Sequence, residues 1–248
     1  MGDRKKIILI EGTDKSGKQT QSNLLVQRLK QENIPVATMS FPRYDTPTGR
    51  IIGQCYLGKE NLGQGDTGWF ENATKLDPKI ASLYFAADRL AAQEEIKTIL
   101  YDIPQRHLVL DRYVESNIAH QGGKIDNIGQ KKRFIKFIRR LEYIELGIRK
   151  PEIKVFLHMP HELGIELGKG MDEKPDAHEA DKNHLKNAEE TYLLLTKEWG
   201  WKTVSCAHPK WKPSQTIEDF CLENPDEFPV RSREEIHQDI YDYVIKKI

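Results

Sequence analysis

A glycine-rich segment near the N-terminus has the residue types and spacing of a phosphate-binding loop. Residues 11–18 (EGTDKSGK) follow the apolar run 7–10 and precede an amphipathic segment. Glycine at positions 12 and 17 lets the backbone adopt positive φ, so that N–H groups of the turn and of the following helix point at an anion. Lys18 adds a mobile positive charge for the β- and γ-phosphates. The pattern predicts a nucleotide-binding P-loop with ATP contacts from Gly12, Asp14, Lys15, Ser16, Gly17, Lys18, Gln19 and Thr20.

The residue after this loop departs from the usual P-loop pattern. Gln19 occupies the position where Ser or Thr commonly meets Mg²⁺, and Thr20 lies one position late. The longer arm of glutamine puts metal coordination by the loop in doubt. We expect Asp111 to provide a larger share of the coordination of the Mg²⁺ that accompanies ATP. It follows the apolar run 107–110, and an Asp at a strand tip beside a P-loop commonly binds this ion. A structural ion pair at a helix start is the alternative.

Positive side chains follow two of the predicted strands. Arg43 comes after the second strand, and Arg112 comes directly after Asp111. Arginine can bind phosphate oxygens bidentately, and phosphoryl transfer between two phosphorylated substrates must neutralise charge at both ends of an in-line path. We expect Arg43 and Arg112 to serve the acceptor, and Lys15 to reach the transferring group. The predicted catalytic residues are Lys15, Lys18, Asp111 and Arg112.

An aromatic ring and an arginine in one predicted helix suit recognition of a nucleobase. Phe85 and Arg89 are four residues apart and therefore share a helical face. The ring could stack on a base while the guanidinium hydrogen-bonds to its edge. A core Phe beside a surface Arg is the alternative, and the pattern alone favours it.

Apolar runs alternate with helical patterns along most of the chain. This alternation is typical of a parallel sheet covered on both faces, with ligands beyond the carboxyl ends of the strands. We expect an α/β protein with a three-layer P-loop NTPase fold, in which helices flank a parallel sheet of about five strands. The predicted strands are 6–10, 36–41, 107–110, 155–158 and 202–204, and the predicted helices are 19–31, 78–100, 131–146, 160–167, 188–198 and 233–247.

Two polar stretches interrupt what we interpret as a single kinase domain, residues 1–248. Segment 168–181 has almost no apolar content and separates two predicted helices, so we expect a lid there. The tract 208–230 carries four prolines and is predicted to be an insertion, with no role that the sequence assigns.

Composition restricts the class of protein. The 248 residues include 38 Lys and Arg and 38 Asp and Glu, so no basic excess favours nucleic acid as a partner. Three scattered cysteines lack metal-ligand or disulfide spacing, which favours a reducing compartment. No apolar run approaches the roughly 20 residues of a membrane span, and the N-terminus lacks the pattern of a signal peptide. We expect a cytoplasmic protein that does not act on membranes.

The motifs together resemble the thymidylate kinase family, nucleoside-monophosphate kinases that make dTDP from dTMP. The resemblance covers most of the chain and rests on the order and spacing of the motifs. They are residues 11–18, 41–44 (FPRY), 83–89 (LYFAADR), 111–117 (DRYVESN), the lid ending at Asp181 and 231–237 (RSREEIH). The resemblance implies phosphorylation of dTMP by ATP with Mg²⁺, in a protein that is usually a homodimer.

The resemblance also implies roles for single residues. Asp14 would receive the sugar 3′-hydroxyl of the acceptor, while Arg43 and Arg112 would bind its phosphate. Phe85 would stack on thymine, and Arg89 would hydrogen-bond to its edge. Further implied contacts are Tyr44, Asn117, His120, Asp176, His178 and Glu179 for the acceptor nucleotide, and Arg231 for the adenine of ATP.

Several positions depart from the family pattern. Lys15 stands where some members carry arginine, and His120 stands where an aromatic ring that guards against a 2′-hydroxyl is common. Residues 168–174 contain lysines but no arginine, so a catalytic lid arginine is absent. Two alternatives stay open: a kinase for another (deoxy)nucleotide, and a nucleotide-binding regulatory protein with little turnover.

Overall fold

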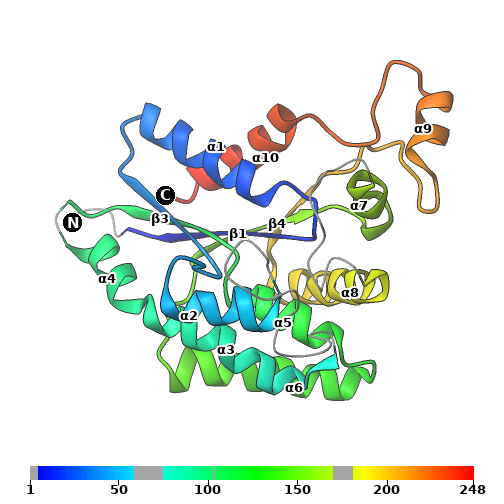
Figure 1. Cartoon of the computed structure of the whole chain (residues 1–248). Helices are drawn as coiled ribbons and strands as arrows, with labels where there is room; N and C mark the ends of the chain where they lie inside the picture. The colour runs from blue at the N-terminus through cyan, green and yellow to red at the C-terminus, as the bar shows by residue number, and fades with distance from the viewer. Residues whose placement is uncertain (1–4, 59–74, 103, 170–180) are drawn as a thin grey trace.

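The computed structural model describes residues 5–58, 75–102, 104–169 and 181–248. Within these ranges the chain forms a parallel sheet between layers of helices (Figure 1). The predicted contacts Asp176, His178 and Glu179 lie outside the described residues, as does most of the expected lid.

The sheet has five parallel strands in the order β2-β3-β1-β4-β5, which confirms the predicted fold class. Its central strand is buried along its whole length, because it is paired on both sides and covered on both faces. The strands are β1 (Ile7–Gly12), β2 (Val36–Ser40), β3 (His107–Asp111), β4 (Ile153–His158) and β5 (Lys202–Ser205).

Alternate residues of β1 enter two different cores. Ile7 and Leu9 belong to the cluster that packs against α4, α5, α6 and α8, whereas Ile8 and Ile10 pack against α1, α7 and α10. This division follows from the two-residue period of a strand.

Figure 1 shows α1 and α10 above the sheet and α3, α5 and α6 below it. The helices are α1 (Lys18–Gln31), α2 (Pro47–Arg50), α3 (Pro78–Ala91), α4 (Gln93–Tyr101), α5 (Val114–Gly123), α6 (Ile128–Arg140), α7 (His161–Gly168), α8 (Lys182–Trp199), α9 (Ile217–Glu223) and α10 (Arg233–Ile245), with π-helical turns η1 (Ile51–Tyr56) and η4 (Leu141–Glu145).

The helix predicted over 78–100 is broken at Ala92 into α3 and α4. The side chain of Gln93 donates from Nε2 to the Arg89 carbonyl at 2.8 Å, while its Oε1 accepts from the backbone N–H of Arg149 at 2.9 Å. A side chain that occupies a carbonyl of the last turn ends the regular ladder. This contact comes from residues far along the chain, so the local pattern could not predict it.

Helix α5 was missing from the predicted elements. It ends in Gly122 and Gly123, which have low helix propensity. A Cβ on Gly123 would lie 3.0 Å from the backbone nitrogen of Ala188, so glycine lets α5 approach α8 closely. Close packing on α8 therefore accounts for a helix that propensity disfavours.

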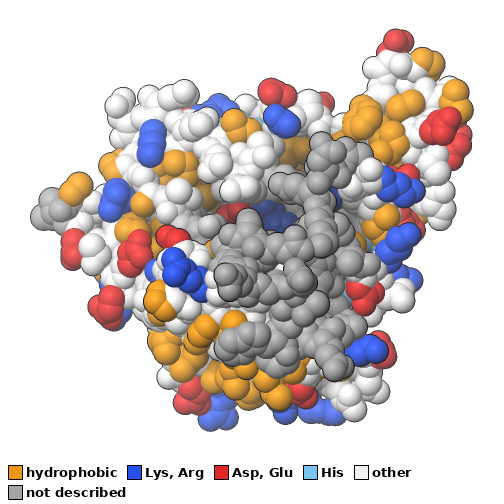
Figure 2. All heavy atoms as spheres, in the orientation of Figure 1, with side chains coloured by type: hydrophobic (Ala, Val, Ile, Leu, Met, Phe, Trp, Pro, Cys, Tyr) orange, Lys and Arg blue, Asp and Glu red, His pale blue; other side chains and the backbone are white. Residues whose placement is uncertain are grey.

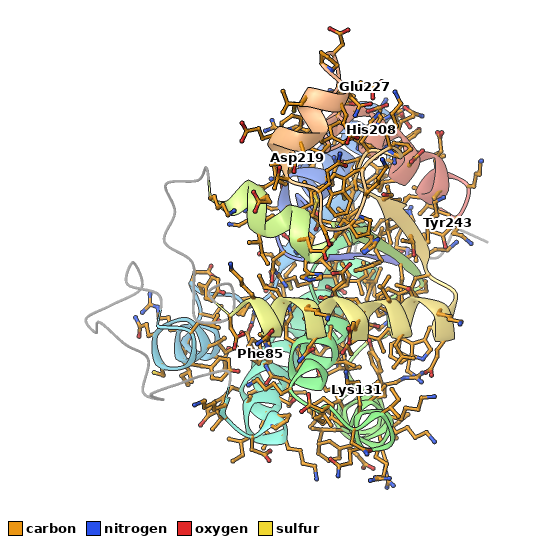
Figure 3. The ribbon with its side chains drawn as sticks, turned by 90° about the vertical axis from the view of Figure 1, so that its right-hand side faces the viewer. Phe85, Lys131, His208, Asp219, Glu227 and Tyr243 are labelled. Carbon is orange, nitrogen blue, oxygen red and sulfur yellow. The ribbon has the colours of Figure 1, made fainter. Side chains whose placement is uncertain are left out.

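The predicted insertion at 208–230 leaves the body of the protein beside β5. Its two ends are joined by an antiparallel bridge between Ala207 and Val230 and by a hydrogen bond of 2.7 Å from the His208 N–H to the Pro229 carbonyl. Between these ends lies α9, which projects outward in Figure 1. Figure 3 shows His208 and Glu227 together on this projection, far from Phe85.

None of the described helices has the length and apolar character needed to cross a bilayer.

Candidate active site

The loop between β1 and α1 has the backbone of a phosphate cradle. Lys15 and Gly17 both adopt positive φ, of 59° and 75°. The Thr13 hydroxyl donates to the Met159 carbonyl at 2.6 Å and accepts from the Met159 N–H at 2.9 Å, which ties the loop to the end of β4. A Cβ on Gly12 would come within 2.7 Å of the Leu157 carbonyl oxygen, so only glycine fits there. The predicted P-loop geometry is therefore present.

Lys18 is buried at the first turn of α1. Its ammonium group donates to the Thr13 carbonyl at 2.7 Å. Burial lowers the pKa of Lys18 to about 8, and nearby Arg112 acts in the same direction, while Asp14 and Asp111 partly offset both. A buried ammonium with one carbonyl partner has donors left for phosphate oxygens.

Asp14 and Arg112 form an ion pair in the cavity beside this loop. Arg112 Nη2 lies 2.9 Å from Asp14 Oδ1. Burial raises the pKa of Asp14, but electrostatic interactions with Arg112, His120 and Lys18 together outweigh this effect, so the carboxyl pKa lies well below its usual range. Arg112 itself has a φ of 63°, in the left-handed region that non-glycine residues rarely adopt. This strain occurs at a residue predicted to bind phosphate, as is common at functional sites.

His120 extends the pair into a chain of hydrogen bonds. Arg112 Nη1 lies 3.2 Å from His120 Nε2, and His120 Nδ1 lies 3.3 Å from His184 Nε2. Because arginine can only donate, Nε2 of His120 must accept and Nδ1 must carry the proton. Burial lowers the pKa of His120 to about 3, with Arg112 contributing and Asp14 opposing. The ring is therefore neutral near pH 7.

Asp111 stands at the tip of β3, as predicted. Its Oδ1 atom is buried, and no residue in the described part of the chain hydrogen-bonds to it. Burial raises the pKa of this carboxyl, although Arg112 and Lys18 oppose the shift. A hard divalent cation would satisfy the oxygen and favour the ionised form. The site thus fits Mg²⁺, which the predicted reaction requires.

One cavity of about 490 Å³ joins the predicted donor and acceptor residues. Phe85 and Asn117 line it together with Lys18 and Gln19. The predicted residues that line it are Asp14, Lys15, Gly17, Lys18, Gln19, Thr20, Tyr44, Phe85, Arg89, Asp111, Arg112, Asn117 and His120.

Arg43 is predicted to bind the acceptor phosphate but is not among the residues that line this cavity. Its Nη1 atom lies 3.1 Å from Glu95 Oε2, and its Nε atom lies 3.7 Å from Asp88 Oδ1. Its neighbours Pro42 and Tyr44 do line the cavity. In this conformation the guanidinium is held by acidic partners at the edge of the site.

Arg89 is buried in the floor of the cavity, so the alternative of a surface arginine is wrong. It pairs bidentately with the buried Glu142, through Nε to Oε2 at 2.6 Å and Nη2 to Oε1 at 2.7 Å. Burial opposes the charge of Arg89, but Glu142 outweighs burial and raises its pKa. Sequence reasoning missed Glu142, because an acidic residue inside a predicted helix gives no local signal that it is buried.

Glu11 is a second acidic residue that the sequence interpretation did not assign. Its fully buried carboxylate accepts from the backbone N–H groups of Tyr113 and Ser116, at 2.8 and 3.0 Å, and from the Tyr192 hydroxyl at 2.8 Å. It thus joins the ends of β1 and β3 to α5 and α8. The only signal in the sequence was an acidic residue at the end of an apolar strand.

Arg231 lies on the other side of the P-loop. Its backbone N–H donates to the Cys206 carbonyl at 2.9 Å, and the Cys206 thiol lies 3.6 Å from the Ser16 carbonyl oxygen. The guanidinium pairs with Asp239 at 2.9 Å. Ser16 itself is buried and donates to the Thr13 carbonyl, so its hydroxyl supports the loop.

A second cavity, of about 270 Å³, lies between α7 and α8 and shares Asp14, Lys15 and His120 with the first. Glu189 lines it and joins two histidines, with Oε1 2.6 Å from His158 Nε2 and Oε2 2.6 Å from His161 Nδ1. The sequence interpretation did not single out this cluster.

Comparisons with known proteins agree on one family. A family model described as thymidylate kinase matches residues 10–217. The chain is 32% identical over 155 residues to the thymidylate kinase of Plasmodium falciparum, and the match covers 62% of each chain. It is 31% identical to a probable thymidylate kinase of Methanocaldococcus jannaschii, with 79% of this chain and 85% of the relative covered. A thymidylate kinase of Mycobacterium tuberculosis is 30% identical, with 74% and 79% covered.

A solved structure agrees with the fold. The thymidylate kinase of Candida albicans superposes with a TM-score of 0.59 at 21% identity, and the match covers 96% of this chain and 94% of that one. At this identity the likeness supports the architecture alone.

Proposed function

Because the chain belongs to the thymidylate kinase family, we propose that it transfers the γ-phosphoryl group of ATP to dTMP and releases dTDP and ADP. The observation that carries the proposal is the single cavity in which P-loop residues and a base-reading pair face the same space. A transfer between two nucleotides needs both within one water-excluding site.

The donor end of the cavity binds the phosphates of ATP. N–H groups of the P-loop and of the α1 N-terminus receive the phosphate oxygens, and Lys18 supplies a buried positive charge. Asp111, whose Oδ1 has no hydrogen-bond partner among the described residues, would hold Mg²⁺, and Gln19 lines the same space. When bound, Mg²⁺ neutralises charge that develops on the phosphate oxygens. Arg231 lies on the adenine side, and Ser16 maintains the shape of the loop.

The acceptor end binds dTMP. Arg112 contacts the acceptor phosphate, and its ion pair with Asp14 holds it at the centre of the cavity. Arg43 turns toward the phosphate by releasing Glu95, a pairing that costs little to break because Glu95 is exposed, while its Nε stays near the buried Asp88. Lys15 reaches the transferring group from the loop. Phe85 stacks on thymine, and Tyr44, Asn117 and His120 complete the walls.

A second copy of the chain covers α3 and α6 in the proposed assembly. Leu83 and Ile80 on α3 and Phe137 on α6 are exposed, by 52%, 47% and 39%. Lys79 of α3 lies 5.4 Å from the centre of the Phe137 ring, so the two helices are neighbours. Figure 2 shows hydrophobic side chains gathered along the lower edge of the molecule, where Figure 1 places α3 and α6. Exposed apolar patches of this kind mark interfaces.

The proposed location is the cytoplasm, where thiols stay reduced. Cys55, Cys206 and Cys221 are all free, which suits that compartment.

Product analysis with a panel of acceptors tests the proposed reaction. Purified protein is incubated with ATP, Mg²⁺ and one of dTMP, dUMP, dCMP, dGMP or AMP, and the nucleotides are separated by chromatography. We expect equal amounts of ADP and dTDP with dTMP, and much slower reaction with dCMP and the purines. Faster turnover of another monophosphate would overturn the substrate assignment, and ATP binding without any diphosphate product would favour a regulatory protein.

A further inference from the structure

Glu142 lies behind the base end of the cavity, in the π-helical turn η4. It is fully buried, and its two oxygens contact two residues that line the cavity. Oε2 accepts from Arg89 Nε at 2.6 Å, and Oε1 accepts both from Arg89 Nη2 at 2.7 Å and from Asn117 Nδ2 at 3.0 Å. One carboxylate therefore orients both side chains. Such π-helical turns are frequent at functional sites.

The contacts of Asn117 determine which way its amide points. Its nitrogen lies within 3.0 Å of Glu142 Oε1 and 3.3 Å of the Ser82 carbonyl oxygen. Both neighbours can only accept hydrogen bonds, so the amide nitrogen has to face them and Oδ1 has to face the opposite way.

The oxygen of this amide is a buried acceptor in need of a donor. Asn117 is 3% exposed, and no donor among the described residues reaches its Oδ1 atom. An unpaired buried acceptor is destabilising unless something satisfies it. Since Asn117 lines the cavity, a ligand there is the partner that can donate to it.

Arg89 supplies the complementary group beside this acceptor. Its Nε and one Nη2 hydrogen go to Glu142, and Nη1 makes a long contact of 3.4 Å with the Tyr113 carbonyl. Further Nη hydrogens are left to donate. An acceptor next to a donor matches the N3–H and O4 edge of a 4-oxopyrimidine. A 4-aminopyrimidine presents the reverse pattern, an acceptor at N3 and a donor at N4.

We infer that Glu142 is a positioning residue that sets selectivity for 4-oxo over 4-amino pyrimidine nucleotides by locking the Asn117 amide with its oxygen toward the base. The inference rests on the proposed function and adds a residue that contacts no substrate. A site built to hydrogen-bond a substrate rejects analogues that leave its buried polar groups unpaired.

The substitution Glu142→Gln tests this role. Glutamine keeps one acceptor oxygen where the carboxylate has two, so Arg89 and Asn117 compete for it and the Asn117 amide is free to turn and present Nδ2 to the base. We expect the ratio of kcat/KM for dTMP to that for dCMP to fall by roughly tenfold or more. KM for dTMP should rise while KM for ATP stays unchanged. A purely structural role would lower turnover of both nucleotides and leave their ratio at the wild-type value.

Glu145→Gln is the matched control, because Glu145 lies in the same turn with a side chain that is 53% exposed. It should keep the wild-type ratio. Glu142→Asp covers the case in which Glu142→Gln fails to fold. It keeps a negative charge for Arg89, but its shorter side chain cannot span both partners, so the ratio should still fall by about threefold or more.

A wild-type ratio in folded Glu142→Gln, or in Glu142→Asp if the glutamine variant is unfolded, would overturn the inference. Failure of the proposed function is recognised separately, because wild-type protein would then not phosphorylate dTMP. In that case the selectivity is measured as the ratio of the binding affinities of dTMP and dCMP for the same variants.

Discussion

Lys18 has to stay charged in a buried position, and this requirement explains its surroundings. Asp14 and Asp111 both raise the pKa of its ammonium group, against the effects of burial and of Arg112. The triphosphate of ATP adds further negative charge, so substrate binding stabilises the cation that it needs. The same logic explains why Arg112 and Asp14 lie together: each would be costly to bury alone.

Removal of the Lys18 charge should slow turnover far more than it weakens the fold. We expect Lys18→Ala to lower kcat by about 10²- to 10³-fold, because charge that develops on the phosphate loses a preorganised partner. Steady-state kinetics measure the effect. Lys30→Ala removes an exposed lysine from the same helix and should leave kcat unchanged. Near-normal kcat for Lys18→Ala would contradict the role of the P-loop.

His120 should make stability depend on pH. Its pKa falls from an ordinary 6.5 to about 3 on folding. The unfolded chain therefore binds a proton that the folded protein excludes, and the stabilisation present above pH 6.5 is lost as the pH falls toward 3. Between pH 7 and pH 5 this loss amounts to no more than about 2 kcal/mol.

Denaturant titrations of wild type and His120→Phe at pH 7 and pH 5 measure this contribution. His184, Arg112 and Asp14 face the ring and remain in both proteins. Wild type should lose more stability than the variant over this interval. Equal losses would mean that His120 is protonated in the folded protein.

At the scale of elements, the site depends on how β1, β4 and α5 meet. The Thr13 hydroxyl joins the P-loop to β4 through both backbone groups of Met159. Thr13→Val would leave a buried N–H and a buried carbonyl unpaired, so we expect a loss of about 1–3 kcal/mol in the free energy of unfolding. KM for ATP should also rise more than KM for dTMP, because the loop is loosened.

Denaturant titration and steady-state kinetics check both effects. Thr38→Val makes the same substitution at an exposed position of β2 and should change neither quantity appreciably. Unchanged stability of Thr13→Val would show that this bond is replaceable.

Local patterns predicted the sheet and most helices, because apolar runs and P-loop spacing are properties of neighbouring residues. The break at Ala92 and the helix α5 were missed, since they depend on Gln93 meeting Arg149 and on Gly123 packing against Ala188. The same reason explains which residues of the site could be predicted from the sequence. Motif positions such as Lys18 and Arg112 could be predicted, whereas Glu142 acts through partners that are distant in the sequence.

At the scale of the whole molecule, the parallel sheet brings the ends of β1 and β3 to one edge, and the cavity lies there. Helices α3 and α6 lie on the same side of the sheet, and their outer surfaces carry the exposed apolar side chains. The proposed homodimer would thus form on the layer that also carries Phe85 and Arg89.

The assembly can be tested with a charge on this face. Leu83→Lys should convert a dimer into a monomer in light scattering after size-exclusion chromatography, because burial of an ammonium at an apolar interface is costly. Leu222→Lys is the control, since Leu222 is 75% exposed on the distant α9. A monomeric wild type, or a Leu83→Lys protein that stays dimeric, would refute this interface.

The central claim is that one cavity holds ATP and dTMP end to end. A crystal structure with a non-hydrolysable ATP analogue, Mg²⁺ and dTMP tests it most directly. We predict triphosphate on the P-loop with the metal at Asp111, thymine against Phe85, and the dTMP phosphate between Arg112 and the γ-phosphate. Thymidylate bound elsewhere, or a cavity filled by one nucleotide alone, would contradict the account.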